Sequence, residues 1–138
     1  MIKEEISVNK EGSRKKGNGA YKLETALAWV SCMQRGKSPI DRLKEQEIEQ
    51  IIIYGTTELG ELLVEEAQQK NYKILAITDR AVREGGYEYQ GISVIKRKDI
   101  EKYRDEVIVV TSMTFWEEIK DELHTEGCSR VIALRELM

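Results

Sequence analysis

The sequence is poor in the residues that build metal centres and nucleophilic triads. It has one histidine, His124, and two cysteines, Cys32 and Cys128, which stand far apart. Zinc sites need several Cys or His ligands at short spacings, and a Ser-His-Asp triad needs a histidine beside its nucleophile. We therefore expect neither kind of site. We interpret the cysteines as structural residues in a reducing compartment.

Long apolar runs are also missing. No stretch approaches the roughly 20 residues that cross a bilayer, and the N-terminus lacks the apolar core of a secretory signal. We therefore expect a cytoplasmic protein without a membrane span. The length of 138 residues fits a single domain.

Strong charge of one sign is absent as well. The net charge is -3, although residues 1–22 carry six Lys or Arg against three Glu. Nucleic-acid binding surfaces have a denser set of cations, interleaved with aromatic side chains. We expect a solvated tail here and no nucleic-acid partner.

The N-terminal third divides into an arm and a helical lead-in. Residues 1–19 are polar and glycine-rich, which predicts a flexible arm. Residues 20–48 are predicted to form two helices that cover a face or edge of the sheet that follows. The first ends near Gly36, and Ser38 caps the second. Apolar residues recur in the first helix at three- and four-residue steps: Leu23, Ala26, Leu27, Val30 and Met33, with Trp29 beside them.

From residue 49 to residue 138, short apolar runs alternate with helical patterns. The runs predict five strands, at 51–54, 73–78, 92–95, 107–110 and 131–134. The helical patterns lie at 58–70, 98–103 and 114–126, with Thr114 as a cap and Phe115, Ile119 and Leu123 facing inward, and residues 80–91 are read as a loop. This alternation predicts an α/β, Rossmann-like three-layer sandwich with a five-stranded parallel sheet in the order 3-2-1-4-5.

The turn after the first predicted strand carries the main binding motif. Gly55 and Gly60 match the first and third glycines of the dinucleotide pattern G-x-G-x-x-G, whereas Thr57 replaces the middle one. The hydroxyls of Thr56 and Thr57 and the N–H groups of the helix start remain suited to one phosphate or carboxylate. The alternative is a structural turn that keeps two glycines for packing.

Polar residues follow two more of the predicted strands. Asp79 stands where a carboxylate accepts ribose hydroxyls, or where it braces its own loop. Arg80 suits a 2′-phosphate or is an ordinary exposed loop residue. Thr111 and Ser112 would contact a phosphate or nicotinamide at the carboxyl edge of the sheet, or simply form a turn. No acid–base pair accompanies these residues, so we expect no catalytic residue.

Several segments together resemble a known family. They are Ile51-Ile52-Ile53-Tyr54-Gly55, Leu59-Gly60-Glu61-Leu62-Leu63, Ile77-Thr78-Asp79-Arg80, Gly91-Ile92-Ser93-Val94-Ile95 and Val107-Ile108-Val109-Val110-Thr111-Ser112. Over residues 20–138 the chain resembles the N-terminal nucleotide-sugar-binding domain of bacterial sialic-acid and bacillosamine O- or N-acetyltransferases. It is also similar to Rossmann-like segments of glycosyltransferases and teichoic-acid-type glycerophosphotransferases.

The resemblance implies a role in the synthesis of surface polysaccharides. It implies that Gly55, Gly60 and Asp79 hold the uridine nucleotide of a sugar donor, whereas Thr57 departs from the pattern and puts diphosphate binding in doubt. The left-handed β-helix that transfers the acetyl group in that family has no counterpart in this sequence.

The leading hypothesis is a non-catalytic module that binds a nucleotide or nucleotide-sugar and assists a glycan-synthesis enzyme. An NAD(P)-like nucleotide remains an open alternative as the ligand. A second hypothesis is an interaction domain that has lost its ligand and docks enzymes or forms a homodimer through its N-terminal helices. The third is a small NAD(P)-dependent oxidoreductase.

Overall fold

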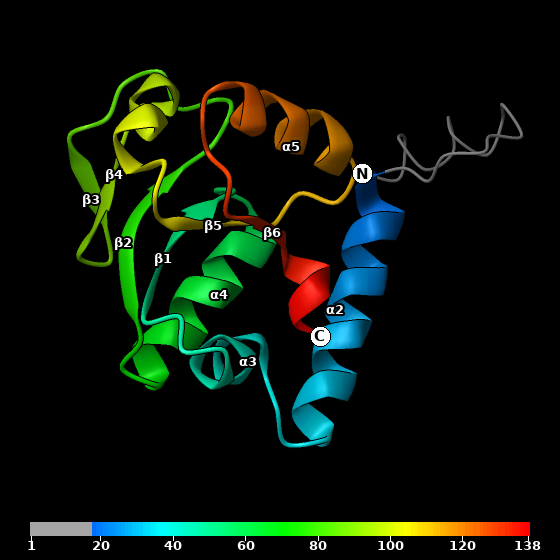
Figure 1. Cartoon of the computed structure of the whole chain (residues 1–138). Helices are drawn as coiled ribbons and strands as arrows, with labels where there is room; N and C mark the ends of the chain where they lie inside the picture. The colour runs from blue at the N-terminus through cyan, green and yellow to red at the C-terminus, as the bar shows by residue number, and fades with distance from the viewer. Residues whose placement is uncertain (1–17) are drawn as a thin grey trace, which may run out of the picture.

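The computed structural model describes residues 18–138, which form a mixed α/β fold around one six-stranded, mostly parallel sheet (Figure 1). The strands follow the order β3-β4-β2-β1-β5-β6 across the sheet. Their bounds are β1 (Gln50–Tyr54), β2 (Lys73–Thr78), β3 (Tyr87–Tyr89), β4 (Ile92–Val94), β5 (Val107–Val110) and β6 (Val131–Ala133). The helices are α2 (Asn18–Gln34), α3 (Pro39–Glu45), α4 (Glu58–Gln69) and α5 (Trp116–Thr125), with 3-10 helices η1 (Arg97–Tyr103) and η2 (Leu134–Leu137).

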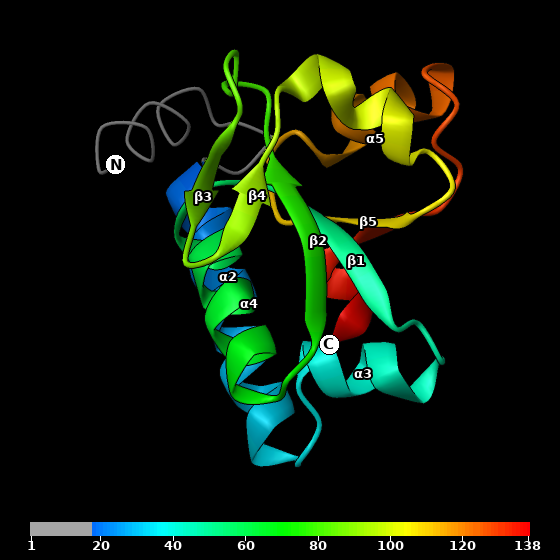
Figure 2. The ribbon, with the colours of Figure 1, turned by 90° about the vertical axis from the view of Figure 1, so that its left-hand side faces the viewer.

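The prediction of five parallel strands is wrong, because the sheet has a sixth strand, β3. This extra strand also changes the strand order across the sheet. The segment read as a loop contains β3, which pairs antiparallel with β4 at the sheet edge (Figure 2). Gln90 and Gly91 both have positive φ, at 50° and 83°, and form the two-residue turn of this hairpin. The other five strands are parallel to one another and keep the relative order predicted for them.

Strand β1 forms the centre of the sheet. It pairs in parallel with β2 on one side and β5 on the other. Because successive side chains alternate between faces, Ile51 and Ile53 enter one core and Ile52 the other, and all three are fully buried. The first core is covered by α2, α3, α4 and η2, and the second by η1 and α5.

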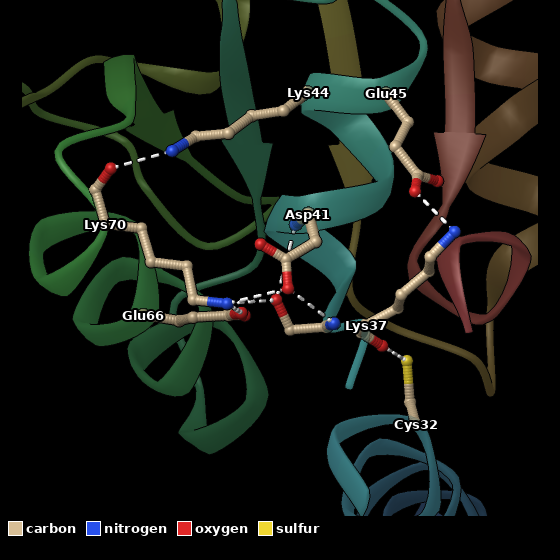
Figure 3. Close-up of polar contacts among 8 residues, drawn as sticks. Cys32, Lys37, Asp41, Lys44, Glu45, Glu66 and Lys70 are labelled. Carbon is tan, nitrogen blue, oxygen red and sulfur yellow. Dashed lines mark hydrogen bonds and ion pairs between the residues drawn. The ribbon is translucent and has the colours of Figure 1, made fainter. Parts of the chain in front are cut away.

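Helix α3 begins as predicted. Ser38 Oγ accepts the Asp41 N–H, and Asp41 Oδ2 accepts the Ser38 N–H at 3.0 Å, which completes a capping box. Lys70, just after α4, donates to Asp41 Oδ2 at 2.8 Å and to Ser38 Oγ at 2.9 Å (Figure 3). This hydrogen bond from Lys70 is the main reason that the pKa of Asp41 lies below its ordinary value. The cap therefore also ties α3 to the end of α4.

Helix α2 reaches the first core, as predicted, but not through its periodic apolar residues. Thr25, Trp29 and Cys32 are the buried residues, and Trp29 joins the first core. Only one side of a helix at the edge of the fold can contact the core, and the large indole occupies that side. The apolar series faces outward instead, and we call its four exposed members the α2 stripe: Leu23, Leu27, Val30 and Met33.

The helix ends agree with the sequence except at the starts of α2 and α5. Helix α2 begins at Asn18, within the predicted flexible arm 1–19, and the remainder of that arm lies outside the described residues. Gly36, Asn71 and Gly127 take positive φ beyond the ends of α2, α4 and α5. At the start of α5 the capping residue is Phe115, and not Thr114 as predicted. Phe115 is also 43% exposed rather than inward. Within residues 18–138, no helix has the length and apolar content required to cross a bilayer.

Candidate functional site

The candidate site lies where β1, β2 and β5 end and α4 begins. In a parallel sheet these carboxyl ends share one edge. A cavity of about 250 Å³ opens there. Of the predicted site residues, its lining includes Gly55, Thr57, Asp79, Arg80, Thr111 and Ser112, whereas Thr56 and Gly60 lie outside it.

The two glycines of the motif are required by packing. Gly55 has φ +146°, and a Cβ there would stand 1.8 Å from Oγ1 of Thr111. A Cβ on Gly60 would stand 2.1 Å from the carbonyl oxygen of Gly55. The first glycine thus brings β1 against β5, and the second brings α4 against the turn. Both glycines would be needed here even without a ligand.

Thr57, at the missing middle glycine, is the N-cap residue of α4. Its backbone is extended, and its side chain makes no hydrogen bond to the first turn of the helix. The side chain lines the cavity. Thr57 therefore narrows the space where a diphosphate would lie, but it also places a hydroxyl at the positive end of α4.

The carboxylate of Asp79 makes its hydrogen bonds to the glycine turn and to its own loop. Its Oδ2 accepts the backbone N–H of Thr56 at 3.0 Å and the Thr56 hydroxyl at 2.8 Å. Its Oδ1 accepts the N–H of Ala81 at 2.7 Å. The carboxylate thus fastens the end of β2 to the glycine turn, which is the bracing role that the sequence leaves open for it.

Arg80 extends along the rim of the cavity towards α5. Its guanidinium lies 3.0 Å from Glu122 and 3.9 Å from Glu118, and stands 5.5 Å from the centre of the Phe115 ring. The cation is 38% exposed. It can therefore exchange these surface carboxylates for an anion in the cavity at small cost.

A second cation at the cavity comes from a residue that sequence analysis missed. Lys22 of α2 lines the cavity and donates to Glu58 Oε1 at 2.9 Å. This hydrogen bond lowers the pKa of the Glu58 carboxyl below its ordinary value. No sequence signal marks Lys22, because its approach depends on how α2 packs beside the start of α4.

Behind the cavity, a partly buried ion pair holds Tyr54 in place. Arg97 donates from Nε to the Tyr54 hydroxyl at 2.9 Å and makes two hydrogen bonds of 2.8 Å to Glu126. The Glu126 bonds raise the pKa of Arg97 further, while burial raises the pKa of Tyr54. Tyr54 therefore forms a neutral, fixed wall of the cavity.

A second, smaller cavity lies on the other side of the glycine turn. It measures about 200 Å³ and is mainly apolar, with the two tyrosines of β3 on its wall. Thr56 and Gly60 line this cavity, whereas Asp79 does not. Its lining comprises Gly55, Thr56, Gly60, Glu61, Val64, Ile77, Tyr87, Tyr89 and Val94.

Comparison with known proteins gives one family and one fold neighbour. The family model described as C2185-like, N-terminal, matches residues 47–132. A similar solved structure is the crystal structure of RSP, a Rex-family repressor, with 16% sequence identity and a TM-score of 0.48. The alignment covers 91% of this chain and 65% of that one, so this chain spans less than two thirds of its length. No curated protein matches.

Proposed function

The chain belongs to the C2185-like, N-terminal family, and from that premise we propose that it is a non-catalytic binding module for a nucleotide or nucleotide-sugar. The ligand's phosphate would occupy the cavity at the carboxyl ends of β1, β2 and β5. For the fold, we propose that the mixed α/β architecture is a Rossmann-like, three-layer sandwich with β3 as an additional antiparallel strand at one edge. The observation that carries the proposal is the convergence of two cations and a helix N-terminus on this one cavity.

The charges of the cavity favour an anion. Lys22 and Arg80 both line it, and the first turn of α4 adds N–H groups and the positive end of the helix dipole. Each cation is paired with an acidic side chain that is itself largely exposed: Glu58 at 70% and Glu122 at 47%. A phosphate can displace such carboxylates, because exposed ion pairs contribute little.

The size of the cavity favours a small ligand. At about 250 Å³ it lies just below the range of roughly 300–1,000 Å³ that small-molecule pockets occupy. Thr57 reduces the space beside the turn further. A nucleoside monophosphate, or the nucleotide end of a sugar donor, fits these limits better than an extended dinucleotide.

The wider setting, in the synthesis of surface polysaccharide beside a glycan-synthesis enzyme, is part of the proposal. It rests on the resemblance to the acetyltransferase and glycosyltransferase modules, at Gly55, Gly60 and Asp79.

Calorimetric titration with UMP, CMP, UDP, a UDP-sugar, AMP and NAD tests the proposal. We expect at least one mononucleotide to bind and NAD to bind more weakly. Replacing both Lys22 and Arg80 by Met should weaken binding by roughly a hundredfold or more, because hydrogen bonds to charged groups contribute about 1.5–3 kcal/mol each. Lys102→Met is the matched control, since Lys102 is 74% exposed and pairs only with Asp99. Failure of every nucleotide to bind would refute the proposal.

The second candidate is an interaction domain without a ligand. It is favoured by the same turn, because Gly55, Gly60 and Asp79 all have structural partners in the absence of any nucleotide. The titration separates the two candidates: an interaction domain shows no saturable binding, and its melting temperature does not change with any nucleotide of the panel.

A further inference from the structure

We propose that the α2 stripe is the contact surface for a second copy of this chain, with the two α2 helices packed antiparallel about a two-fold axis. Its members, Leu23, Leu27, Val30 and Met33, are exposed by 61%, 60%, 53% and 55%. Figure 1 shows α2 at the outer edge of the molecule, where another molecule can reach it. This inference does not depend on whether the cavity binds a nucleotide.

The chain cannot cover the stripe by rotating α2. The opposite side of the helix holds Trp29, 6% exposed, together with the buried Thr25 and Cys32. Lys22 is also held by Glu58 at the start of α4. Turning the stripe inward would expose the indole and break this contact. Within residues 18–138, therefore, no rearrangement of α2 buries these side chains.

The charge pattern of α2 selects the kind of partner. Lys22 and Glu24 are its only charged residues, and from Thr25 to Gln34 there is none. A partner with a charged groove would find no counter-charge along those residues, so its own charges would be desolvated at a cost. A second α2 stripe is free of charge over the same length, and the contact opposes no like charges.

The spacing of the stripe suits a two-fold axis. The steps between its members are four, three and three residues, which are nearly the same in both chain directions. When two such helices pack antiparallel about a point near Ala28, Leu27 faces Val30 of the partner subunit and Leu23 faces Met33 of the partner subunit. A two-fold contact requires this kind of self-complementary surface.

The area of the stripe indicates how stable the dimer is. A Leu, Val or Met side chain carries on the order of 100 Å² of apolar surface, so the α2 stripe exposes roughly 200 Å² per copy at these fractions. Two copies supply the apolar centre of an interface in the small class, below about 1,200 Å² in total, whose complexes are weak and reversible. The dimer is therefore concentration-dependent.

Sedimentation velocity of the full chain, from roughly 5 to roughly 500 µM, tests the association. We expect a reversible monomer–dimer equilibrium, which Leu27→Lys weakens at least tenfold. The matched control is Tyr87→Lys on β3, since Tyr87 is 56% exposed and lies outside α2; its dissociation constant should equal that of the wild type. A monomer at every concentration would overturn the proposal and leave the stripe to another occupant. Equal weakening by both variants would overturn it too.

Cross-linking with a short bismaleimide tests the orientation. In the antiparallel pair, a mixture of Leu23→Cys and Met33→Cys chains should cross-link, whereas each variant alone should not. Identical residues there lie about 15 Å apart along the axis, at 1.5 Å per residue. A parallel pair would give the opposite pattern and overturn the arrangement. The native Cys32 and Cys128, at 1% and 0% exposure, provide little background.

Discussion

Among single residues, Gly60 constrains the candidate site most directly. Its missing side chain lets α4 approach the backbone of Gly55, a rigid neighbour that cannot turn aside as a flexible side chain can. The same approach fixes the first turn of α4 beside the cavity. The third glycine of the motif thus positions the site whether or not a ligand is present.

Gly60→Ala should therefore lower the free energy of unfolding. Overpacking against well-ordered neighbours costs about 1–3 kcal/mol, and this outweighs the gain of roughly 1 kcal/mol that alanine brings to a helix. Urea unfolding measures the difference. Gly86→Asn is the comparison, because the added Cβ has no atom within 4 Å and so tests no overpacking; its φ of +85° brings backbone strain, which asparagine tolerates best among the residues with a side chain. A variant Gly60→Ala as stable as the wild type would contradict the close approach of α4 to the turn.

For single residues, the sequence predicts where the backbone requires a glycine better than it predicts which polar side chains pair with each other. The motif identifies Gly55 and Gly60 because the geometry of a strand–turn–helix recurs wherever it forms. It does not show that Asp79 accepts two hydrogen bonds from Thr56, because that choice depends on how β2 and the turn meet. The sequence does not mark Lys22 as a site residue either, because it reaches the cavity only through the packing of α2, 36 residues before Glu58.

Among the elements, α3 shows how a short helix is secured. Its seven residues are too few to be stable alone. The capping box, Lys70 and the burial of Ile40 and Leu43 together hold it against α4 and the first core. Asp41 contributes to both the cap and the ion pair, so its charge should matter to stability.

Asp41→Asn should reduce the free energy of unfolding by about 1 kcal/mol near neutral pH, because it removes a negative charge that the start of α3 and Lys70 stabilise. The folded protein lowers the pKa of Asp41 below 3.8, so its carboxylate stabilises the fold above that pH. This contribution is lost as the pH falls through the folded-state pKa. The gap between wild type and variant should therefore shrink as the pH falls below 3.8, as followed by urea unfolding across pH.

Glu45→Gln is the control for Asp41, because Glu45 pairs with Lys37 on the exposed side of the same helix. It should change stability by less than about 0.5 kcal/mol. A gap between wild type and Asp41→Asn that stays constant down to about pH 2 would show that the charge of Asp41 is unimportant.

The elements themselves are largely predictable, and the exceptions have physical causes. Five strands follow from buried apolar runs, but β3 is a short edge strand with exposed residues and has no such run. Its turn, Gln90-Gly91, lacks the Asn-Gly or Asp-Gly pair that marks a hairpin most clearly. The outward direction of the α2 stripe does not follow from the sequence, because periodicity identifies an apolar face but not what covers it.

At the scale of the whole molecule, the sheet separates two cores. Ile53 of β1 belongs to the core beneath α4, and Ile119 of α5 belongs to the core on the opposite face. Each side chain is almost fully buried. Changes in one core therefore reach the other only through the backbone of the sheet.

Ile53→Val and Ile119→Val should each cost about 0.5–1.5 kcal/mol, and the double variant should match their sum within about 0.5 kcal/mol. Chemical denaturation of the four proteins measures this cycle. As a comparison, Ile53→Val and Leu63→Ala lie in the same core and are expected to couple. A coupling across the sheet as large as that within one core would contradict the separation of the two cores.

The central position of β1 also has a consequence for synthesis on the ribosome. β2 follows soon after it, but its other neighbour, β5, begins only at Val107. At roughly 5–20 residues per second, the 52 residues between β1 and β5 require about 3–10 s to be made. During this interval one edge of the isoleucine-rich strand has no partner from its own chain. For several seconds the nascent protein thus presents an unpaired, apolar strand edge at its future centre, and such edges favour aggregation.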